Sequence, residues 1–326
     1  MQQSDHFDGR RFFNPEAATR TRLWQMLRWL ATRRKQRWPK WVEDEPASGP
    51  PDAVGAGELA LTFVNHSTFL IQTDVLNVLT DPVWSERVSP LRWAGPRRVR
   101  APGVAFEKLP PIQLVLVSHS HYDHMDLATL RRLERRFRPL FLTGLGNGRL
   151  LSSRGLGRVE ELDWWHSFRT ESGVEVTMTP ARHFSRRGLL DTNRSLWGGF
   201  LLRDAGRKVY FAGDSGYGPH FAEVGRRFGG VDVALLPIGA YEPRWFMRPH
   251  HVNPEEAVRV HLDLRSRQSV AMHFGTFQLT DEPIDEPVRA LGDALARHCV
   301  PERDFRVPRF GETILFAPAR AYGRPR

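Results

Sequence analysis

Short apolar segments separated by polar residues occupy the part of the chain that follows residue 58. Residues 59–64, 68–73 and 76–80 are rich in Leu, Val, Phe and Thr, and brief polar breaks divide them. Runs of this length with such breaks are typical of antiparallel strands joined by tight turns. Residues 114–117, Leu-Val-Leu-Val, form an unbroken apolar run. This pattern predicts a strand that is buried on both faces.

Helical periodicity appears at two places beyond this strand. Leu127, Leu130, Leu133 and Phe137 lie on one helical face, and charged residues, mostly arginines, occupy the opposite face. Asn253, followed by a proline and two glutamates, is a typical helix start. Strands and helices in this order favour an α+β fold, in which two sheets pack together and helices cover them.

Residues 144–148, Gly-Leu-Gly-Asn-Gly, follow an apolar run and resemble the glycine-rich turn of a dinucleotide-binding fold. Arg149 stands where that fingerprint requires its third glycine. We therefore interpret the segment as an ordinary turn.

The N-terminal part of the chain combines apolar and basic residues with helical spacing. The segment at residues 20–41 contains an amphipathic pattern that predicts a helix, and Pro39 should end this helix. One arc of this helix is apolar and consists of Leu23, Trp24, Met26, Leu27 and Leu30.

A linker follows the predicted helix, because residues 46–52 are rich in proline and small residues. We therefore divide the chain into an N-terminal arm with its linker, residues 1–55, and a main domain, residues 56–326. Two interpretations of the arm stay open. It packs on the main domain, or it lies as an interfacial helix on a membrane.

The strongest chemical signal directly follows the buried run at 114–117. This segment contains His119, His121, Asp123 and His124. At the end of an extended strand, residues i and i+2 point the same way, so His119 and His121 should converge on one spot. Imidazoles and carboxylates at this density are typical of metal sites, and one such segment can supply two neighbouring ions.

Three further candidates, His183, Asp214 and His273, each follow another apolar run. Because strand ends at one sheet edge can meet, we expect these side chains to join the first four in one site. Asp81 follows the run at 76–80, and we expect its carboxylate to orient a ligand imidazole through a hydrogen bond. His66 lies between two predicted strands, and we interpret it as a turn residue.

Composition indicates which classes of partner and site the protein can have. The chain has 326 residues and a net charge of +10, which favours anionic partners such as nucleic acid, a membrane surface or a phosphorylated substrate. Cys299 is the single cysteine, which excludes a disulfide framework and a cysteine-based zinc cage. No apolar run has the length of a signal-peptide core or a membrane span. We therefore expect a cytoplasmic protein with peripheral membrane association.

Several motifs are similar to those of one enzyme family. They are residues 79–82, 162–165, 196–198, 211–217, 238–247 and 273–277. These segments resemble the N-acylphosphatidylethanolamine-hydrolysing phospholipase D family of the metallo-β-lactamase superfamily, and the likeness extends from residue 59 to residue 312. The run at 238–247, Ile-Gly-Ala-Tyr-Glu-Pro-Arg-Trp-Phe-Met, is especially specific. The resemblance implies a four-layer αβ/βα sandwich.

The resemblance also implies two Zn2+ ions and a ligand set for each. One ion would be bound by His119, His121 and His183, and the other by Asp123, His124 and His273. Asp214 would bridge the two ions. Diiron relatives in the superfamily generally place a glutamate where His121 stands here, which argues against an oxidoreductase.

Roles around the metal centre follow from the same resemblance. Asp123, Asp214 and His251 would be the catalytic residues, with His251 as a proton donor or a phosphate contact. Substrate or membrane contacts would come from Trp245, Phe246, Arg248 and His250. His250 departs from the family pattern, so the division of roles between His250 and His251 stays open. Phe184, beside His183, departs from it as well.

The implied function is hydrolysis of N-acylphosphatidylethanolamine to phosphatidic acid and N-acylethanolamine by a zinc-dependent phosphodiesterase. The zinc ions would acidify bound water and hold the phosphoryl oxygens. The implied partners are a phospholipid substrate, an anionic membrane surface and a second copy in a homodimer.

Several alternative functions belong to other classes of enzyme or protein. A sugar-phosphate lactonase or another phosphodiesterase of the same fold would use the same ligands, and a metal-free membrane scaffold is more remote. A nuclease is disfavoured because Asp214 and His273 lie too close in sequence to enclose a nucleic-acid-clamping domain, so we expect no nucleic-acid partner. A β-lactamase is disfavoured partly because Cys299 is not placed as a ligand.

Overall fold

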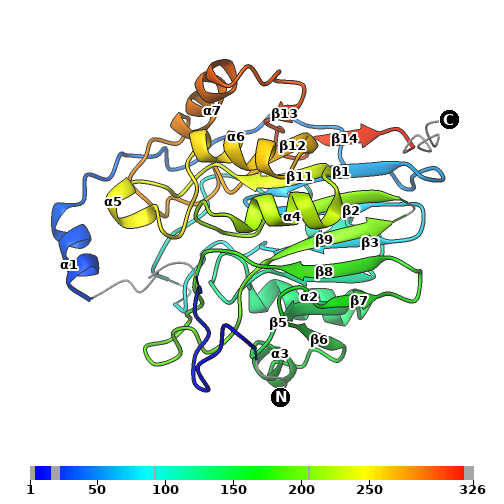
Figure 1. Ribbon diagram of the computed structural model, residues 1–326, viewed down its shortest axis with the longest axis horizontal. Coiled ribbons are helices and arrows are strands. Elements are labelled where there is room, and N and C mark those ends of the chain that lie inside the picture. Colours follow the sequence, from blue (N-terminus) through cyan, green and yellow to red (C-terminus); the bar gives the residue numbers. More distant parts are fainter. Residues whose placement is uncertain (1–3, 16–22, 92, 205, 319–326) are drawn as a thin grey trace.

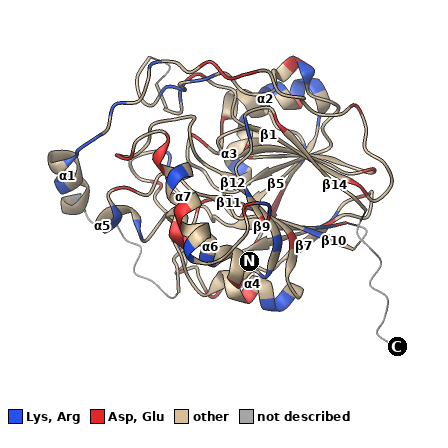
Figure 2. Cartoon of the chain, turned by 90° about the horizontal axis from the view of Figure 1, so that it is seen from above, with Lys and Arg blue, Asp and Glu red and all other residues tan. Residues whose placement is uncertain are grey.

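Two mixed β-sheets face each other in the computed structural model, which describes residues 4–15, 23–91, 93–204 and 206–318 (Figure 1). Helices cover the outer face of each sheet, so the layers follow the order helices, sheet, sheet, helices (Figure 2). The predicted four-layer α+β sandwich is therefore confirmed.

The first sheet has seven strands in the order β14-β1-β2-β3-β4-β5-β6. Their bounds are β1 (Leu59–Asn65), β2 (Thr68–Gln72), β3 (Asn77–Thr80), β4 (Leu114–Val117), β5 (Leu140–Gly144), β6 (Val159–Leu162) and β14 (Thr313–Phe316). The strands β1, β2 and β3 pair antiparallel, which confirms the predicted meander. From β3 to β6 the strands are parallel, and β14 pairs antiparallel with β1.

The second sheet also has seven strands, in the order β13-β12-β11-β10-β9-β8-β7. Their bounds are β7 (Ser167–Arg169), β8 (Glu175–Thr179), β9 (Gly199–Asp204), β10 (Arg207–Phe211), β11 (Val231–Pro237), β12 (Ser266–Met272) and β13 (Phe305–Arg306). The strands from β7 to β10 are antiparallel, and those from β10 to β13 are parallel.

The helices within the described residues are α1 (Leu23–Thr32), α2 (Leu127–Phe137), α3 (Gly148–Ser153), α4 (His220–Phe228), α5 (Arg244–Met247), α6 (Pro254–Asp263) and α7 (Glu286–Arg297), with a short 3-10 helix at Phe106–Lys108. The predictions of α2 and α6 are confirmed. At the start of α6, Asn253 and Glu256 form a capping box, in which each side chain accepts a hydrogen bond from the other residue's backbone N–H. Not one of these helices is long and apolar enough to cross a membrane.

The strand β4 is buried on both faces, as its unbroken apolar sequence predicts. Leu114 and Leu116 belong to the main core, to which both sheets contribute, whereas Val115 and Val117 pack in a second core with Leu130 of α2. Burial on both sides fixes the position of the segment that follows β4.

The turn at residues 144–148 lies between β5 and α3, as predicted. A Cβ atom on Gly144 would lie 2.7 Å from Leu196 O, and Gly146 adopts a φ of +84°. Glycine is needed here because the neighbouring segment around Leu196 packs directly on the turn.

The helix of the N-terminal arm ends earlier than predicted, and residues 20–22 of the prediction lie outside the described residues. It ends at Thr32, so the prediction that Pro39 ends it is wrong. Beyond Thr32 the side chains bind another part of the chain instead of continuing the helix. Arg33 Nε lies 2.8 Å from Asp281 Oδ1, and Trp38 Nε1 donates a hydrogen bond to Glu282 O. Tertiary contacts thus override the local helical preference.

The predicted linker lies against the edge of the first sheet. Gly49 N donates a hydrogen bond to Gly311 O, and Gly49 O accepts one from Thr313 Oγ1. Pro51 O accepts a further bond from Gln72 Nε2. These bonds hold residues 49–51 in place beside β14 and β2.

Candidate metal centre

The candidate ligands follow strand ends in both sheets and meet at one end of the sandwich. In the first sheet, β4 ends directly before the segment at 118–124. In the second sheet, His183 follows β8, Asp214 follows β10, and His273 follows β12. All seven predicted side chains are buried except that of His121, which is half-buried. The fold therefore brings the predicted residues together.

Three of the histidines form the first group. His119 Nε2 lies 2.8 Å and His183 Nε2 3.2 Å from His121 Nδ1. The candidate ligand atoms of this group all lie within 4.8 Å of one another. His119 and His121 converge as the spacing predicts.

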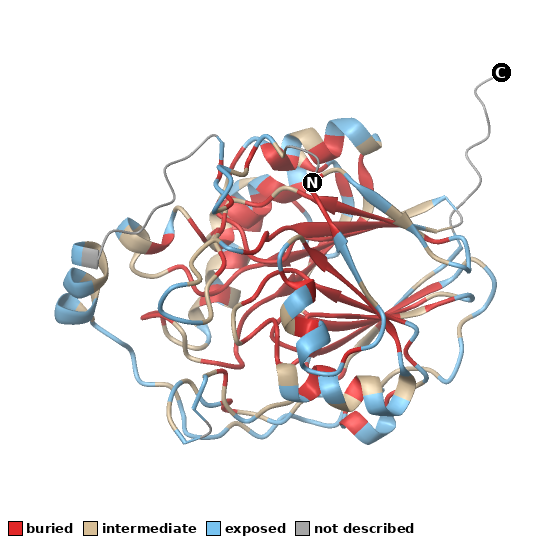
Figure 3. Ribbon diagram, turned by 90° about the horizontal axis from the view of Figure 1, so that it is seen from below, coloured by how far each residue is buried: buried red, intermediate tan, exposed pale blue. Residues whose placement is uncertain are grey.

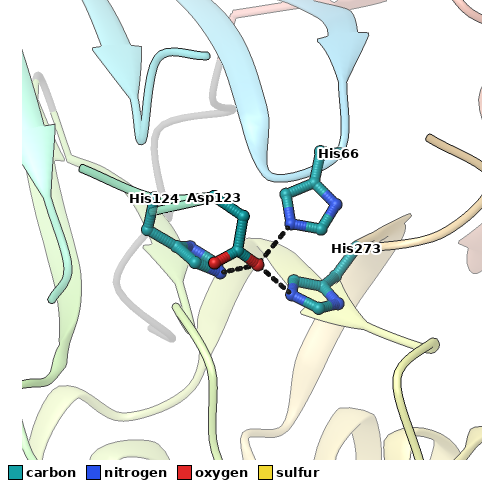
Figure 4. A group of neighbouring side chains, drawn as sticks. All are labelled: His66, Asp123, His124 and His273. Atoms are coloured by element: carbon teal, nitrogen blue, oxygen red, sulfur yellow. Dashed lines mark hydrogen bonds and ion pairs between the residues drawn. The ribbon is translucent and has the colours of Figure 1, made fainter. Parts of the chain in front are cut away.

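The second group is centred on Asp123 (Figure 4). His124 Nε2 lies 3.3 Å and His273 Nε2 3.6 Å from Asp123 Oδ2. A third imidazole, that of His66, approaches the same oxygen to 3.0 Å. This group combines a carboxylate with three imidazoles, one more than the sequence predicts.

Asp214 lies between the two groups. Its Oδ2 is 3.1 Å from His124 Nε2 and 3.2 Å from His273 Nε2. The same oxygen is 4.0 Å from His119 Nε2 and 3.9 Å from His183 Nε2. One carboxylate oxygen thus faces imidazoles from both groups, which is the arrangement that a bridging ligand requires.

The buried polar atoms of the cluster fit a metal. Within the described part of the chain, His124 Nε2, His273 Nε2 and Asp214 Oδ1 are buried and make no hydrogen bond. Buried polar atoms without protein partners are costly, and they are expected where side chains bind an ion or ligand. Imidazole nitrogen and carboxylate oxygen are preferred donors for zinc and related transition metals. The residues therefore fit a pair of such ions.

Electrostatics divide the imidazoles into two kinds. Burial, together with the nearby imidazoles of His124 and His121, holds the pKa of His119 well below its ordinary value. Burial also acts to lower the pKa of His273, but the nearby carboxylates of Asp214 and Asp123 outweigh it and raise that pKa to about 9. The metal-free site therefore carries positive charge beside its carboxylates.

The carboxylates respond in the opposite direction. Burial acts to raise the pKa of Asp214, but His124 and His273 outweigh it and hold that pKa well below its ordinary value. Asp123 behaves in the same way, chiefly because of His124. Both carboxylates are ionised and ready to act as ligands.

Asp81 lies directly behind the cluster, in the turn after β3. Its Oδ2 is 2.6 Å from His124 Nδ1 and accepts a hydrogen bond from Ser118 Oγ at 2.5 Å. Its Oδ1 accepts a bond of 2.7 Å from Ser118 N. The carboxylate therefore contacts one candidate ligand and the start of the segment that carries four of them.

The segment from α5 to His251 forms another side of the site. His251 Nδ1 lies 3.9 Å from Asp214 Oδ2. Trp245 and Arg248 are exposed, and Phe246 packs against Trp29 of α1. His250 is buried against Phe184, so it does not share the surface of Trp245.

Two hydrogen bonds from side-chain donors to backbone carbonyls hold His183. Its Nδ1 donates to His250 O at 3.0 Å, which leaves Nε2 to face the cluster. Asn14 Nδ2 donates to His183 O at 2.8 Å. A residue of the N-terminal arm thus supports a candidate ligand.

The side chain of His66 was missed by sequence reasoning. The residue does lie in the turn between β1 and β2, with a φ of +49°. Its imidazole, however, is buried beside Asp123 and His273. The signal that could have identified it is topological. In the meander, β1 and β3 run in the same direction. The turn after β1, which contains His66, therefore lies at the same end of the sheet as Asp81, which follows β3.

Comparison with known proteins agrees with this geometry. Residues 76–274 match the β-lactamase superfamily domain. The chain is 38% identical over 266 residues to the N-acyl-phosphatidylethanolamine-hydrolyzing phospholipase D 1 of Caenorhabditis elegans, across 78% of this chain and 75% of that protein. It is also 38% identical over 222 residues to the mitochondrial N-acyl-phosphatidylethanolamine-hydrolyzing phospholipase D of Saccharomyces cerevisiae, across 66% of this chain and 47% of that protein.

A solved structure shows the same fold. Igni18, a metallo hydrolase from the archaeon Ignicoccus hospitalis, matches with a TM-score of 0.60 and 24% identity, across 80% of this chain and 99% of that one. The superfamily match covers more than half of the chain, and the nematode relative matches most of both chains. This protein therefore belongs to the β-lactamase superfamily and, within it, to the family of N-acyl-phosphatidylethanolamine-hydrolysing phospholipases D.

Proposed function

We propose that this protein is a zinc-dependent phosphodiesterase that hydrolyses N-acylphosphatidylethanolamine to phosphatidic acid and N-acylethanolamine. The observation that carries the proposal is the position of Asp214 Oδ2, within 4.0 Å of imidazoles from two histidine groups. The relatives named above supply the substrate class, since both hydrolyse this lipid by name.

Two Zn2+ ions would be held by the residues that the two groups contain. His119, His121 and His183 would hold one, Asp123, His124 and His273 the other, and Asp214 would contact both. When bound, such a pair supplies Lewis acidity toward phosphoryl oxygens and makes coordinated water more acidic. Asp81 would keep the ring of His124 in its orientation.

His251 would carry the proton that the leaving alcohol requires. It is half-buried, and its Nδ1 faces Asp214. Burial lowers the pKa of His251 to about 4, although the nearby Asp214 acts to raise it. A phosphate group with its negative charge would favour the protonated ring when substrate is bound, so proton donation by His251 would depend on the occupied site.

A membrane-docking surface surrounds this end of the molecule. In α1, Trp24, Leu27 and Leu30 are 53%, 55% and 53% exposed, and Figure 3 shows most of this helix in the colour of exposed residues. Trp245 of the adjacent α5 is 43% exposed. Tryptophan and leucine beside basic residues such as Arg28 suit the interface of an anionic membrane.

A second apolar element lies in the loop that follows His183. Leu189 and Leu190 are 87% and 80% exposed at the tip of the loop after His183. The base of this loop is fixed to the metal-binding segment, because Arg187 donates hydrogen bonds to Ser120 O and Met125 O. A lipid diester cannot leave the bilayer cheaply, so apolar elements around the site would bring the enzyme to its substrate.

Product analysis would test the reaction. The purified protein would be offered N-acylphosphatidylethanolamine, a glycerophosphodiester and a sugar-phosphate lactone side by side, with metal content measured on the same sample. We expect about two zinc ions per chain and release of N-acylethanolamine with phosphatidic acid. Hydrolysis of the lactone alone would favour the lactonase alternative, and a folded protein without metal would favour a scaffold.

Asp214→Asn is the variant that tests the site. It removes one charge from the oxygen that faces both histidine groups, and activity should fall by orders of magnitude while the fold persists. Asp293→Asn on α7 is the matched control, since it makes the same change at an exposed position. Full activity of Asp214→Asn with unchanged metal content would contradict the proposal.

Three further expectations stay proposals. They are the division of the chain at residue 55, peripheral association with anionic membrane in the cytoplasm, and a homodimer. Light scattering of the purified protein would test the last of them, with twice the chain mass as the expected result.

A further inference from the structure

We infer that His66 is a positioning residue for the metal centre, and that it acts by donating a hydrogen bond from Nε2 to the carboxylate of Asp123. The inference rests on the metal centre described under the proposed function. It assigns a task to a histidine outside the seven expected ligands.

The position of His66 between two candidate ligands is the first observation. Its Nε2 lies 3.0 Å from Asp123 Oδ2. Figure 4 marks this contact with a dashed line. Its ring lies against that of His273, with centroids 4.0 Å apart, and the edge of the Phe277 ring closes another side. The side chain is almost completely buried. A surface turn requires none of these contacts.

The hydrogen bonds of the His66 ring show which of its nitrogens carries the proton. Within the described residues, His66 Nδ1 is buried and has no hydrogen-bond partner. A neutral imidazole carries one proton, and a lone pair on Nε2 would face the negative Oδ2 of Asp123 and repel it. The proton therefore lies on Nε2. Because a protonated nitrogen has no free lone pair, His66 binds the ligand Asp123 and is not itself a metal ligand.

The backbone of His66 ties the same two parts of the site together. Its carbonyl oxygen accepts a hydrogen bond of 2.7 Å from His273 N, and its N–H donates to Thr276 Oγ1 at 3.1 Å. Asp123 follows a strand of the first sheet, and His273 follows a strand of the second. His66 thus contacts one candidate ligand from each sheet and helps to set the distance between them.

A selective effect on one metal follows from this arrangement. The carboxylate of Asp123 belongs to the group that also contains His124 and His273, whereas His66 contacts none of His119, His121 and His183 within hydrogen-bonding distance. Loss of the donor should therefore weaken the binding of one ion by about 10–100-fold and leave the other nearly unchanged.

Two substitutions of His66 distinguish the loss of its hydrogen-bond donor from an effect on the turn. His66→Asn suits the left-handed backbone at a φ of +49°, but its amide nitrogen replaces Nδ1 and does not reach Asp123. The longer side chain of His66→Gln places an amide N–H where Nε2 was. His261→Asn is the control, because it removes a buried imidazole that contacts Ser269 outside the cluster.

The experiment measures metal affinity on the full-length protein. Each variant would be loaded with zinc and titrated with a chelator, and the absorption spectrum of the cobalt-substituted protein would report the second ion. We expect His66→Asn to keep its fold by circular dichroism and to lose one ion about 10–100-fold more readily. His66→Gln should regain most of the affinity.

Two results would overturn the inference. If His66→Asn holds both ions as tightly as the unchanged protein, the residue only shapes the turn. If His66→Gln loses an ion as completely as His66→Asn, a ring nitrogen is required and His66 is a ligand. Metal affinity is measured independently of activity. If the variants show the expected affinities but the unchanged protein hydrolyses no phosphodiester, only the proposed function is contradicted.

Discussion

Trp29 of α1 stacks on Phe246 of α5, with ring centroids 5.0 Å apart and ring planes inclined by 20°. The same tryptophan donates a hydrogen bond from Nε1 to Asp281, and Arg28 lies over the ring of Trp245. The arm helix is thus attached to the short helix that precedes His250 and His251. Figures 1 and 2 both show α1 beside α5. One face of α1 packs on the protein, whereas Trp24, Leu27 and Leu30 of its apolar arc are exposed. Packing of the arm therefore leaves these side chains available, and their contact with a membrane stays a proposal.

Replacing Trp29 should loosen the arm without removing its exposed apolar residues. Trp29→Ala loses the ring stack, which is worth about 0.5–1.5 kcal/mol in aromatic pairs, and the bond to Asp281. We expect faster protease cleavage near α1 and a modest fall in the free energy of unfolding. Trp24→Ser, on the exposed arc, is the matched control and should leave both unchanged. Equal protease resistance of the two variants would show that the stack does not hold the arm.

The loop that carries Leu189 and Leu190 should affect membrane binding but not the chemistry. Changing both residues to serine alters side chains that already face water, so the melting temperature should stay the same. If these leucines enter a bilayer, each contributes about 1.5–3 kcal/mol, so losing both should lower partition onto anionic vesicles at least about 100-fold. Vesicle sedimentation and turnover of a short-chain soluble diester would be measured together. Reduced turnover of the soluble diester would place the loop in the active site instead.

Removing Asp81 should weaken metal binding through His124. Asp81→Ala leaves His124 Nδ1 and the Ser118 donors without their acceptor, and the affinity for metal should fall about 10–100-fold. Asp81→Asn keeps an acceptor oxygen and should lose less. Chelator competition measures this directly. The idea fails if the alanine variant only melts at a lower temperature while zinc content and turnover per folded molecule stay normal.

Metal removal should change how stability depends on pH. In the metal-free protein the pKa of His273 is raised to about 9, against an ordinary value of 6.5, and that of His124 is raised well above the same value. The folded state therefore keeps protons that the unfolded chain has lost, and stability falls as pH rises from 6.5 to about 9.

Other imidazoles of the cluster act on the acid side. Burial lowers the pKa of His66 to about 3, so below its ordinary value of 6.5 the unfolded chain takes up a proton that the folded chain refuses. The chelated protein should thus be most stable near pH 6.5. With metal bound, His124 and His273 hold no proton to lose, and the alkaline decline should disappear. Melting temperatures measured across this pH range with and without chelator would test the prediction. A chelated protein whose melting temperature rises toward pH 9 would contradict it.

The residues that sequence reasoning placed best are those that follow buried strands. His119, His183, Asp214 and His273 each come after an apolar run, and the fold carries strand ends of both sheets to one place. The position of such residues depends on sheet topology, which the hydrophobic pattern largely determines.

Residues in turns and tertiary contacts were harder to predict. The turn at His66 was foreseen, but the direction of its side chain depends on how the second sheet packs on the first. The end of α1 depends on Asp281, which lies far along the chain, and no local propensity reports such a contact. Burial of His250 against Phe184 likewise follows from the packing of two loops.

The pairing of β14 with β1 has a consequence for synthesis in the cell. Leu59 lies opposite Phe316, so the first sheet receives its last strand only after more than 250 further residues have left the ribosome, since 316 − 59 = 257. His273, at the other sheet, is also made late, whereas His119 and His121 emerge early. A growing chain therefore exposes several metal-binding histidines before the complete centre can form. Metal loading is expected to follow synthesis, and chaperone protection of the early histidine segment would fit this order of events.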